Sequence, residues 1–245
     1  TGLTNGVSYT FDVQATNGVQ YGPAGTSGSV SPAAPRAVFG GGLTTGGSRT
    51  NIMDYIDMST TGNATDFGDL IASVENNSSC ASSTRGIFFG GNDGGDSQTI
   101  NYITIITTGN ASDFGNLDPT ATDGAACSNE TRGIIGGTGG VVASYITIAS
   151  TGNSATFGNL TGSPNISQLG ACASTTRGVF AGGLRGSTSN IIDYVTIDTT
   201  GNATDFGDLI STTRSLSGAS NSTRGVFGGG GSFGSGNVIQ YITIA

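Results

Sequence analysis

Residue types that carry most enzyme chemistry are missing from this chain. Its 245 residues include no histidine, no lysine and no tryptophan, and only three cysteines. The usual general bases and activated nucleophiles are therefore absent, and catalysis would have to rely on carboxylates. We accordingly expect a protein that is not an enzyme. A carbohydrate-active enzyme with a carboxylate pair is the less favoured alternative.

Charge is also scarce. Charged residues make up 10% of the chain and the net charge is −8, whereas charged residues are roughly 25% of an ordinary globular domain. Such a chain gives little electrostatic support to phosphate binding, so we expect no nucleic-acid partner. No apolar run approaches the ~20 residues of a membrane span, and the N-terminus does not resemble a signal peptide. We therefore expect no membrane insertion.

Glycine is abundant, with 44 residues, and much of it belongs to an internal repeat. An arginine, two small or branched residues, an apolar residue and then glycines recur at steps of 49, 47, 45 and 47 residues. The arginines are Arg36, Arg85, Arg132, Arg177 and Arg224. A period of this length indicates one supersecondary unit per repeat, each stacked on its neighbours.

Each repeat contains four short β-prone segments separated by turn residues. In the fourth repeat these are a small-residue stretch at 168–174, an apolar stretch closed by glycines at 178–183, an alternating stretch at 191–197 and a last stretch at 203–209. Period-two alternation and turn residues predict strands. No stretch has helical periodicity, so the sequence predicts an all-β protein.

The cysteines occupy one position of this repeat. Cys80, Cys127 and Cys172 each lie five residues before an arginine, and Ser31 and Ala219 hold the same position elsewhere. A position that accepts Cys, Ser or Ala is typical of a small buried site. We expect neither disulfides nor a metal site there, because equivalent positions in separate repeats seldom have the close geometry required.

The order of motifs resembles kelch repeats. Gly90 and Gly91, then Tyr102, then Phe114 follow the kelch order of a glycine pair, an aromatic in the third strand and an aromatic in the fourth. Phenylalanine replaces the usual tryptophan, and the basic residue at the start of the unit is missing. The resemblance, shared in period with five-bladed lectin propellers of the tachylectin kind, implies a five-bladed β-propeller of four-stranded antiparallel blades over 27–245. The expected blades are about 27–70, 71–117, 118–160, 161–209 and 210–245.

The two ends of the chain differ from the repeats. Residues 1–26, with Leu3, Tyr9, Phe11 and Val13, resemble the C-terminal part of a fibronectin type III module, entered through a tyrosine corner. The last repeat lacks a fourth strand. The N-terminal strand, a strand from a neighbouring subunit, or further repeats are alternative ways to complete it, and a homo-oligomer is therefore one expectation.

Loop variation predicts where binding occurs. The turns between the first and second strands and between the third and fourth are nearly constant, whereas the second-to-third and fourth-to-first loops vary, as is common on a binding face. Unconstrained drift of these loops is the alternative. The charged residues there are our candidate ligand contacts: Arg49, Asp93, Asp96, Arg185 and Arg214. The repeated arginines, in contrast, are expected to pair with Asp66, Asp113 and Asp205.

One loop has oxygen ligands spaced as in a calcium turn. These are Asn92, Asp93 and Asp96. Calcium takes six or more oxygens, of which this loop supplies few, and turn chemistry explains the same residues equally well. We expect no cofactor other than this candidate calcium.

The near-identical repeats resemble those of structural and tail-fibre proteins of tailed phages. Phrases such as TRGVFGGG and TTGNATDFGDL carry this resemblance, and fibronectin-like modules also occur in virion proteins. It implies a virion or extracellular component that recognises a host glycan or protein, with other virion subunits as further partners. The alternative is a purely structural or polymerising spacer completed by strand donation.

Overall fold

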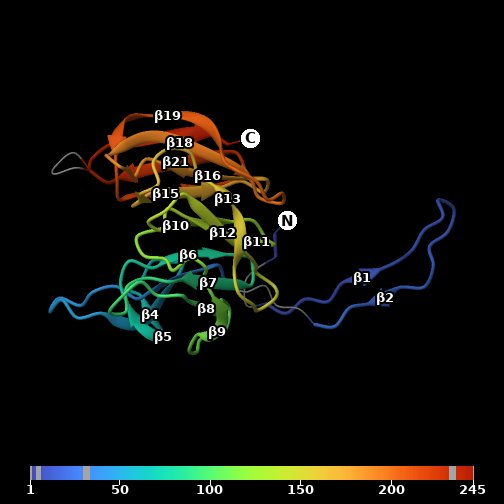
Figure 1. Ribbon diagram of the computed structural model, residues 1–245. Helices are drawn as coiled ribbons and strands as arrows, with labels where there is room; N and C mark the ends of the chain where they lie inside the picture. The colour runs from blue at the N-terminus through green and yellow to red at the C-terminus, as the bar shows by residue number, and fades with distance from the viewer. Residues whose placement is uncertain (1, 4–6, 30–33, 232–235, 245) are drawn as a thin grey trace. The chain divides into compact units, whose positions relative to one another are not determined.

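The computed structural model describes residues 2–3, 7–29, 34–231 and 236–244, and this part of the chain is all-β with no helix (Figure 1). No helical segment in it is therefore long and apolar enough to span a bilayer. The chain divides into two compact units, one formed by 1–37 with 55–65 and the other by 38–54 with 66–245. The prediction of an all-β fold is confirmed.

The first unit contains a short hairpin. Strands β1 (Asp12–Val13) and β2 (Gly25–Thr26) pair antiparallel, with Val13 opposite Gly25. The apolar side chains of this segment, such as Val13 and Tyr21, are exposed. The segment that resembles a fibronectin module therefore has no buried core among its described residues, in keeping with its shortness.

Five antiparallel sheets follow along the chain, one for each repeat of the sequence, and we number them 1 to 5. Sheet 1 is formed by β3 (Arg36–Gly40), β4 (Thr50–Asp57) and β5 (Thr65–Val74). Sheet 2 is formed by β6 (Ser78–Ala81), β7 (Arg85–Phe89), β8 (Thr99–Thr104) and β9 (Ser112–Asn116). Sheet 3 is formed by β10 (Ala125–Ser128), β11 (Arg132–Gly136), β12 (Val142–Thr147) and β13 (Ala155–Asn159).

The last two sheets repeat the same up-and-down order. Sheet 4 is formed by β15 (Gly170–Ala173), β16 (Arg177–Ala181), β18 (Ser189–Thr196) and β19 (Thr204–Thr213). Sheet 5 is formed by β20 (Leu216–Ser220), β21 (Arg224–Gly229) and β22 (Ile239–Thr243). A small pair, β14 (Ile166–Ser167) with β17 (Leu184–Arg185), lies in the loops of the fourth repeat.

Four strands per repeat are thus seen in sheets 2, 3 and 4. The strand expected at the start of the first repeat falls largely on residues 30–33, which lie outside the described residues. Several antiparallel sheets are therefore present, but the described residues do not form a closed propeller. The sheets follow one another in chain order, with the first strands β6, β10, β15 and β20 as successive neighbours (Figure 1).

A cysteine on the first strand of one sheet lies against a glycine on the second strand of the following sheet, and this pair allows the two sheets to approach closely. The Sγ atoms of Cys80 and Cys127 would lie 2.7 and 2.8 Å from a Cβ placed on Gly133 and Gly178 of the following sheet. A side chain on these glycines would collide with the sulfur, so the glycine that follows each interior arginine is needed for close approach. All three cysteines are free, and desolvation raises the pKa of the Cys80 thiol to about 12.

Apolar side chains fill the space between successive sheets. Phe180 is fully buried, and its Cε1 atom would lie 3.4 Å from a Cβ on Gly136 of the preceding sheet. The aromatic residues of the third and fourth strands meet edge to face at ring-centroid distances of about 6 Å. These pairs are Tyr102–Phe114, Tyr145–Phe157 and Tyr194–Phe206. The core is therefore a series of inter-sheet layers.

Candidate functional site

The constant turns connect one sheet to the previous one. Gly109 and Gly152, in the turns between the third and fourth strands, each donate a backbone hydrogen bond of 2.7 Å to a fourth-strand carbonyl of the preceding sheet. The neighbouring asparagine accepts from the same strand, as where the Asp69 N–H donates to Asn110 Oδ1 at 3.0 Å. The turn, which reads Thr-Thr-Gly-Asn or Ser-Thr-Gly-Asn, is nearly constant because its backbone and its asparagine amide join successive sheets.

The repeated arginines also have a structural role. Each guanidinium lies over the ring of the tyrosine diagonally opposite on the neighbouring strand, as Arg132 does over Tyr145 at 4.5 Å from the ring centroid. Its Nη1 atom then donates to a carbonyl of the next sheet, which for Arg132 is Ile197 O at 3.1 Å. Arg85, Arg132 and Arg177 therefore each tie their own sheet to the following one.

For Arg85, Arg132 and Arg177 the expected pairing with aspartates is wrong, because each donates to a backbone carbonyl instead. The ion pairs seen among the described residues are Arg49 with Glu75 and Arg185 with Asp193. An arginine can extend over the tyrosine two residues along the facing strand and reach a carbonyl beyond it, so its charge is satisfied without a carboxylate. The sequence repeat predicted where the arginine recurs, but it did not predict that a tyrosine ring and a backbone carbonyl are its partners.

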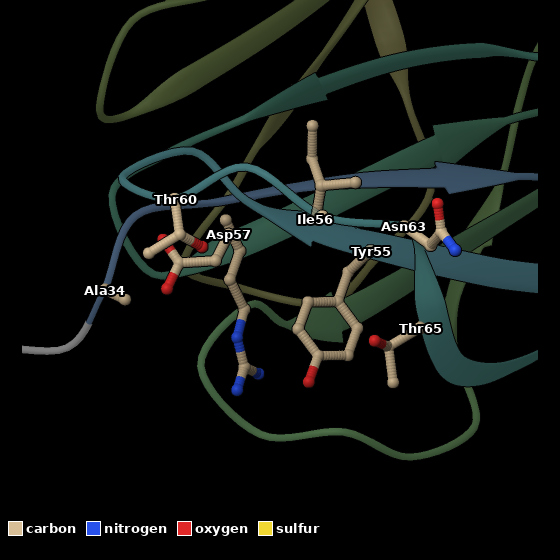
Figure 2. A pocket seen from close by; sticks show the side chains of 9 residues that line it. Ala34, Tyr55, Ile56, Asp57, Thr60, Asn63 and Thr65 are labelled. Carbon is tan, nitrogen blue, oxygen red and sulfur yellow. The ribbon is translucent and has the colours of Figure 1, made fainter.

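A shallow hollow recurs beside the constant turns. In the first unit a hollow of about 240 Å³ is lined by Arg36, Tyr55, Asp57, Thr60 and their neighbours (Figure 2). The pKa of Asp57 lies below its usual range, because its carboxylate accepts hydrogen bonds from the Ser59 hydroxyl and N–H and faces the charge of Arg36. Similar hollows beside Tyr102 and Tyr194 show that the feature follows the repeat.

The variable loops lie together at the opposite end of the sheets. Equivalent residues of four fourth-to-first loops have positive φ, between 55 and 58°, and form a backbone ladder. The Asp123 N–H donates to Asn76 O at 3.3 Å, Gln168 to Asp123 at 2.7 Å, and Ser215 to Gln168 at 2.8 Å. The second-to-third loops join them, since Gly183 N–H donates to Thr213 O at 2.8 Å. The expectation that both loop families share one end is confirmed.

Three candidate contacts lie near one another at this end. The Arg49 Nε donates to Glu75 Oε1 at 3.1 Å, and Glu75 pairs through its backbone with Asn92, the residue that begins the loop containing Asp93 and Asp96. Both aspartates are exposed. The structure thus brings an arginine and several carboxylates together between the loops of sheets 1 and 2.

Arg214 lies apart from this group. It occupies the loop that leads into sheet 5, where its side chain is half-buried and its carbonyl accepts from Gly231 N–H at 3.0 Å. It belongs to the same end of the sheets but to another pair of loops. The sequence placed it correctly on the variable loops without showing that it lies away from the other candidates.

Arg185 is not a surface contact. Its side chain is 2% exposed and its Nη1 donates to Asp193 Oδ2 at 2.8 Å, while the Thr161 hydroxyl donates to Asp193 Oδ1 at 2.5 Å. The Arg185 Nη1 also donates to the Thr161 carbonyl. The β14–β17 pair positions this arginine under the loops, where its guanidinium is paired with Asp193, and its contact with a ligand stays a prediction. Asp193 was missed because the other repeats have Asp, Asn, Ser or Gln at that place.

The candidate calcium loop is an asparagine turn in the structure. The Asn92 side-chain oxygen accepts from Gly94 N–H at 3.0 Å, and Asp93 N–H donates to Gly95 O at 3.2 Å. Residues of the described part form no group of three or more His, Cys, Asp or Glu side chains placed to hold a metal ion. The turn geometry explains the composition of the loop, and calcium stays a prediction.

Comparison of the chain with protein-family models and with curated proteins found no match in either case. The geometry of the loop end is therefore the basis for a functional proposal.

Proposed function

We propose that the chain is a non-enzymatic module that displays its variable loops for binding, as a component of a virion or another extracellular surface. The proposal rests on a difference between the two ends of the sheets: the constant turns lie at one end and the variable loops at the other. The constant turns join successive sheets through their backbone and through the asparagine side chain, whereas the variable loops at the other end are joined through their backbone, which leaves their side chains free to change.

The ligand that suits this end is a polar, hydroxyl-rich surface such as a host glycan, or a protein. Asp93 and Asp96 are exposed acceptors, and Glu75 with Arg49 lies beside them. Carboxylates accept hydrogen bonds from sugar hydroxyls, and backbone groups of neighbouring loops add donors and acceptors. The resemblance of the repeats to kelch units and to tailed-phage structural proteins supports the blade-like interpretation of each sheet and the assignment to a virion.

The experiment is binding of the folded protein to a glycan array and to surface proteins of candidate host cells. We expect the double variant Asp93→Asn, Asp96→Asn to weaken binding about tenfold, the loss that corresponds to one or two polar contacts. Asp113→Asn is the matched control, because Asp113 is also exposed but lies near the constant turns. Blank arrays and no host-protein binding by the folded protein would refute the proposal.

A further inference from the structure

One apolar position of the repeat is buried in every sheet except the first. It is the third residue after the repeated arginine, and its side chain packs on the preceding sheet, as Phe88 does on Gly40, where an added Cβ would lie 3.1 Å from the Phe88 ring. Its exposed fractions are 5% for Phe88, 1% for Ile135, 0% for Phe180 and 1% for Phe227. Phe39 holds this position in sheet 1 and is 59% exposed. The face of sheet 1 that carries Phe39 is therefore uncovered.

The opposite face is uncovered in sheet 5. The residue two places before the tyrosine of the third strand is buried in the other sheets, with exposed fractions of 0% for Met53, 0% for Ile100, 1% for Ala143 and 2% for Ile192. Ile239 holds this position in sheet 5 and is 76% exposed, and Tyr241 beside it is 65% exposed. In sheets 1 to 4 this face is covered by the following sheet.

The Arg224 guanidinium lies on the same face of sheet 5, where the described residues provide no following sheet like the one that supplies a carbonyl acceptor to Arg177. Arg177 lies over Tyr194 and donates to the Ile244 carbonyl of the following sheet at 3.1 Å. Arg224 lies over Tyr241 at 4.5 Å in the same way. Arg224 is exposed, and among the described residues no sheet follows sheet 5 to supply the carbonyl. Sheet 5 thus presents both the apolar and the hydrogen-bonding parts of the inter-sheet interface.

Residue size indicates that the two uncovered faces match each other. Between interior sheets a cysteine faces a glycine, as Cys172 faces Gly225, where an added Cβ would lie 2.6 Å from the sulfur. In sheet 5 the cysteine position is Ala219, and in sheet 1 the glycine position is Ala37. Compared with an interior cysteine–glycine pair, the side chain is smaller in sheet 5, where alanine replaces cysteine, and larger in sheet 1, where alanine replaces glycine. Volume is therefore conserved across this pair, as a packed interface requires.

We propose that the face of sheet 5 in one copy of the chain packs on the face of sheet 1 in another copy. We call the residues of the sheet 5 face the tail face (Arg224, Ile239 and Tyr241) and those of the sheet 1 face the head face (Phe39 and Ile52). Both faces are exposed in the single chain, so a second copy covers them with the kind of interface that already joins successive sheets. Such a contact is heterologous and adds further copies in a row.

The test is sedimentation of the whole chain over a range of concentrations. We expect the average mass to rise with concentration. Phe39→Asp on the head face, or Ile239→Asp on the tail face, is expected to weaken association by more than about a hundredfold, since each places a charge in an apolar interface. Ile106→Asp is the matched control, because Ile106 is 55% exposed but lies at a constant turn.

Mixing the two variants distinguishes head-to-tail contact from other modes. Each variant retains one intact face, so an equimolar mixture is expected to form a one-to-one dimer and nothing larger. A chain that stays monomeric at all concentrations overturns the proposal. So does association that neither variant weakens. A monomer whose melting temperature falls as far with Phe39→Asp as with a substitution of the fully buried Phe180 also overturns it, because the two faces would then meet within one chain. Loss of loop binding leaves association unchanged, so this test is independent of the proposed function.

Discussion

The burial of one phenylalanine position gives the sharpest test of the inter-sheet core. Phe180 is fully buried between sheets 3 and 4, against Gly136 and Leu160. A buried phenylalanine removes roughly 150–250 Å² from water, worth about 4–6 kcal/mol at ~25 cal/mol per Å². Measured costs of Phe→Ala in cores are about 3–5 kcal/mol, and we expect Phe180→Ala to destabilise the chain by that amount.

Phe39→Ala is the matched control, because Phe39 holds the same position of the repeat but is 59% exposed. With about two-fifths of its surface buried and no enclosed cavity left behind, its loss should cost roughly 1–2 kcal/mol. Urea denaturation of both variants, at concentrations where the chain is monomeric, measures the difference. Equal losses of stability would show that the packing of one sheet on the preceding one does not supply the core.

Three further predictions follow from other contacts. Gly178→Ala should destabilise the chain by about 1–3 kcal/mol, because the added Cβ would meet the Cys127 sulfur at 2.8 Å. Adding Cys127→Ala to the same chain should recover part of that loss. A double-mutant cycle measures this recovery, and additive losses would argue against the contact. Asp193→Asn should cost about 3–5 kcal/mol, since it leaves the Arg185 charge buried without its partner, and a melting temperature unchanged from wild type would contradict the buried pair. Burial raises the pKa of the Cys172 thiol to about 12, so the folded state keeps a proton that the unfolded state releases near pH 8.5–9. The contribution of this thiol to stability should therefore be constant below about pH 8.5–9 and decline from there towards pH 12. Thermal melts at several pH values measure the decline, which the Cys172→Ala variant should reduce.

Much of the local structure could be predicted from the sequence. The alternating stretches around Tyr102 and Tyr194 are strands, and the glycine pairs end the second strand, because strand periodicity and positive φ are properties of a few adjacent residues. The small position of Cys80, Cys127 and Cys172, which is buried at Cys127 and Cys172 and half-buried at Cys80, also followed from comparison of the repeats with one another.

The candidate site was predictable only in part. Loop variation located the end of the sheets that carries Arg49, Asp93 and Asp96, since which loops share an end follows from strand order alone. Arg185 was misplaced because burial depends on what covers a loop, and the β14–β17 pair is a contact between separate loops. Likewise, the partner of each repeated arginine is a tyrosine and a carbonyl on different strands, which spacing along the chain does not specify.

The sequence alone determined that similar β units recur along the chain and which turns are nearly constant, because these depend on the period and on local residue preferences. Only the tertiary structure decided whether sheet 1 and sheet 5, formed by the first and last repeats, cover each other. That outcome depends on how each sheet packs on the next, and small differences in packing accumulate over successive interfaces. Phe39 and Phe180 have the same place in the repeat, yet one is exposed and the other is buried, since burial is set by the neighbouring sheet.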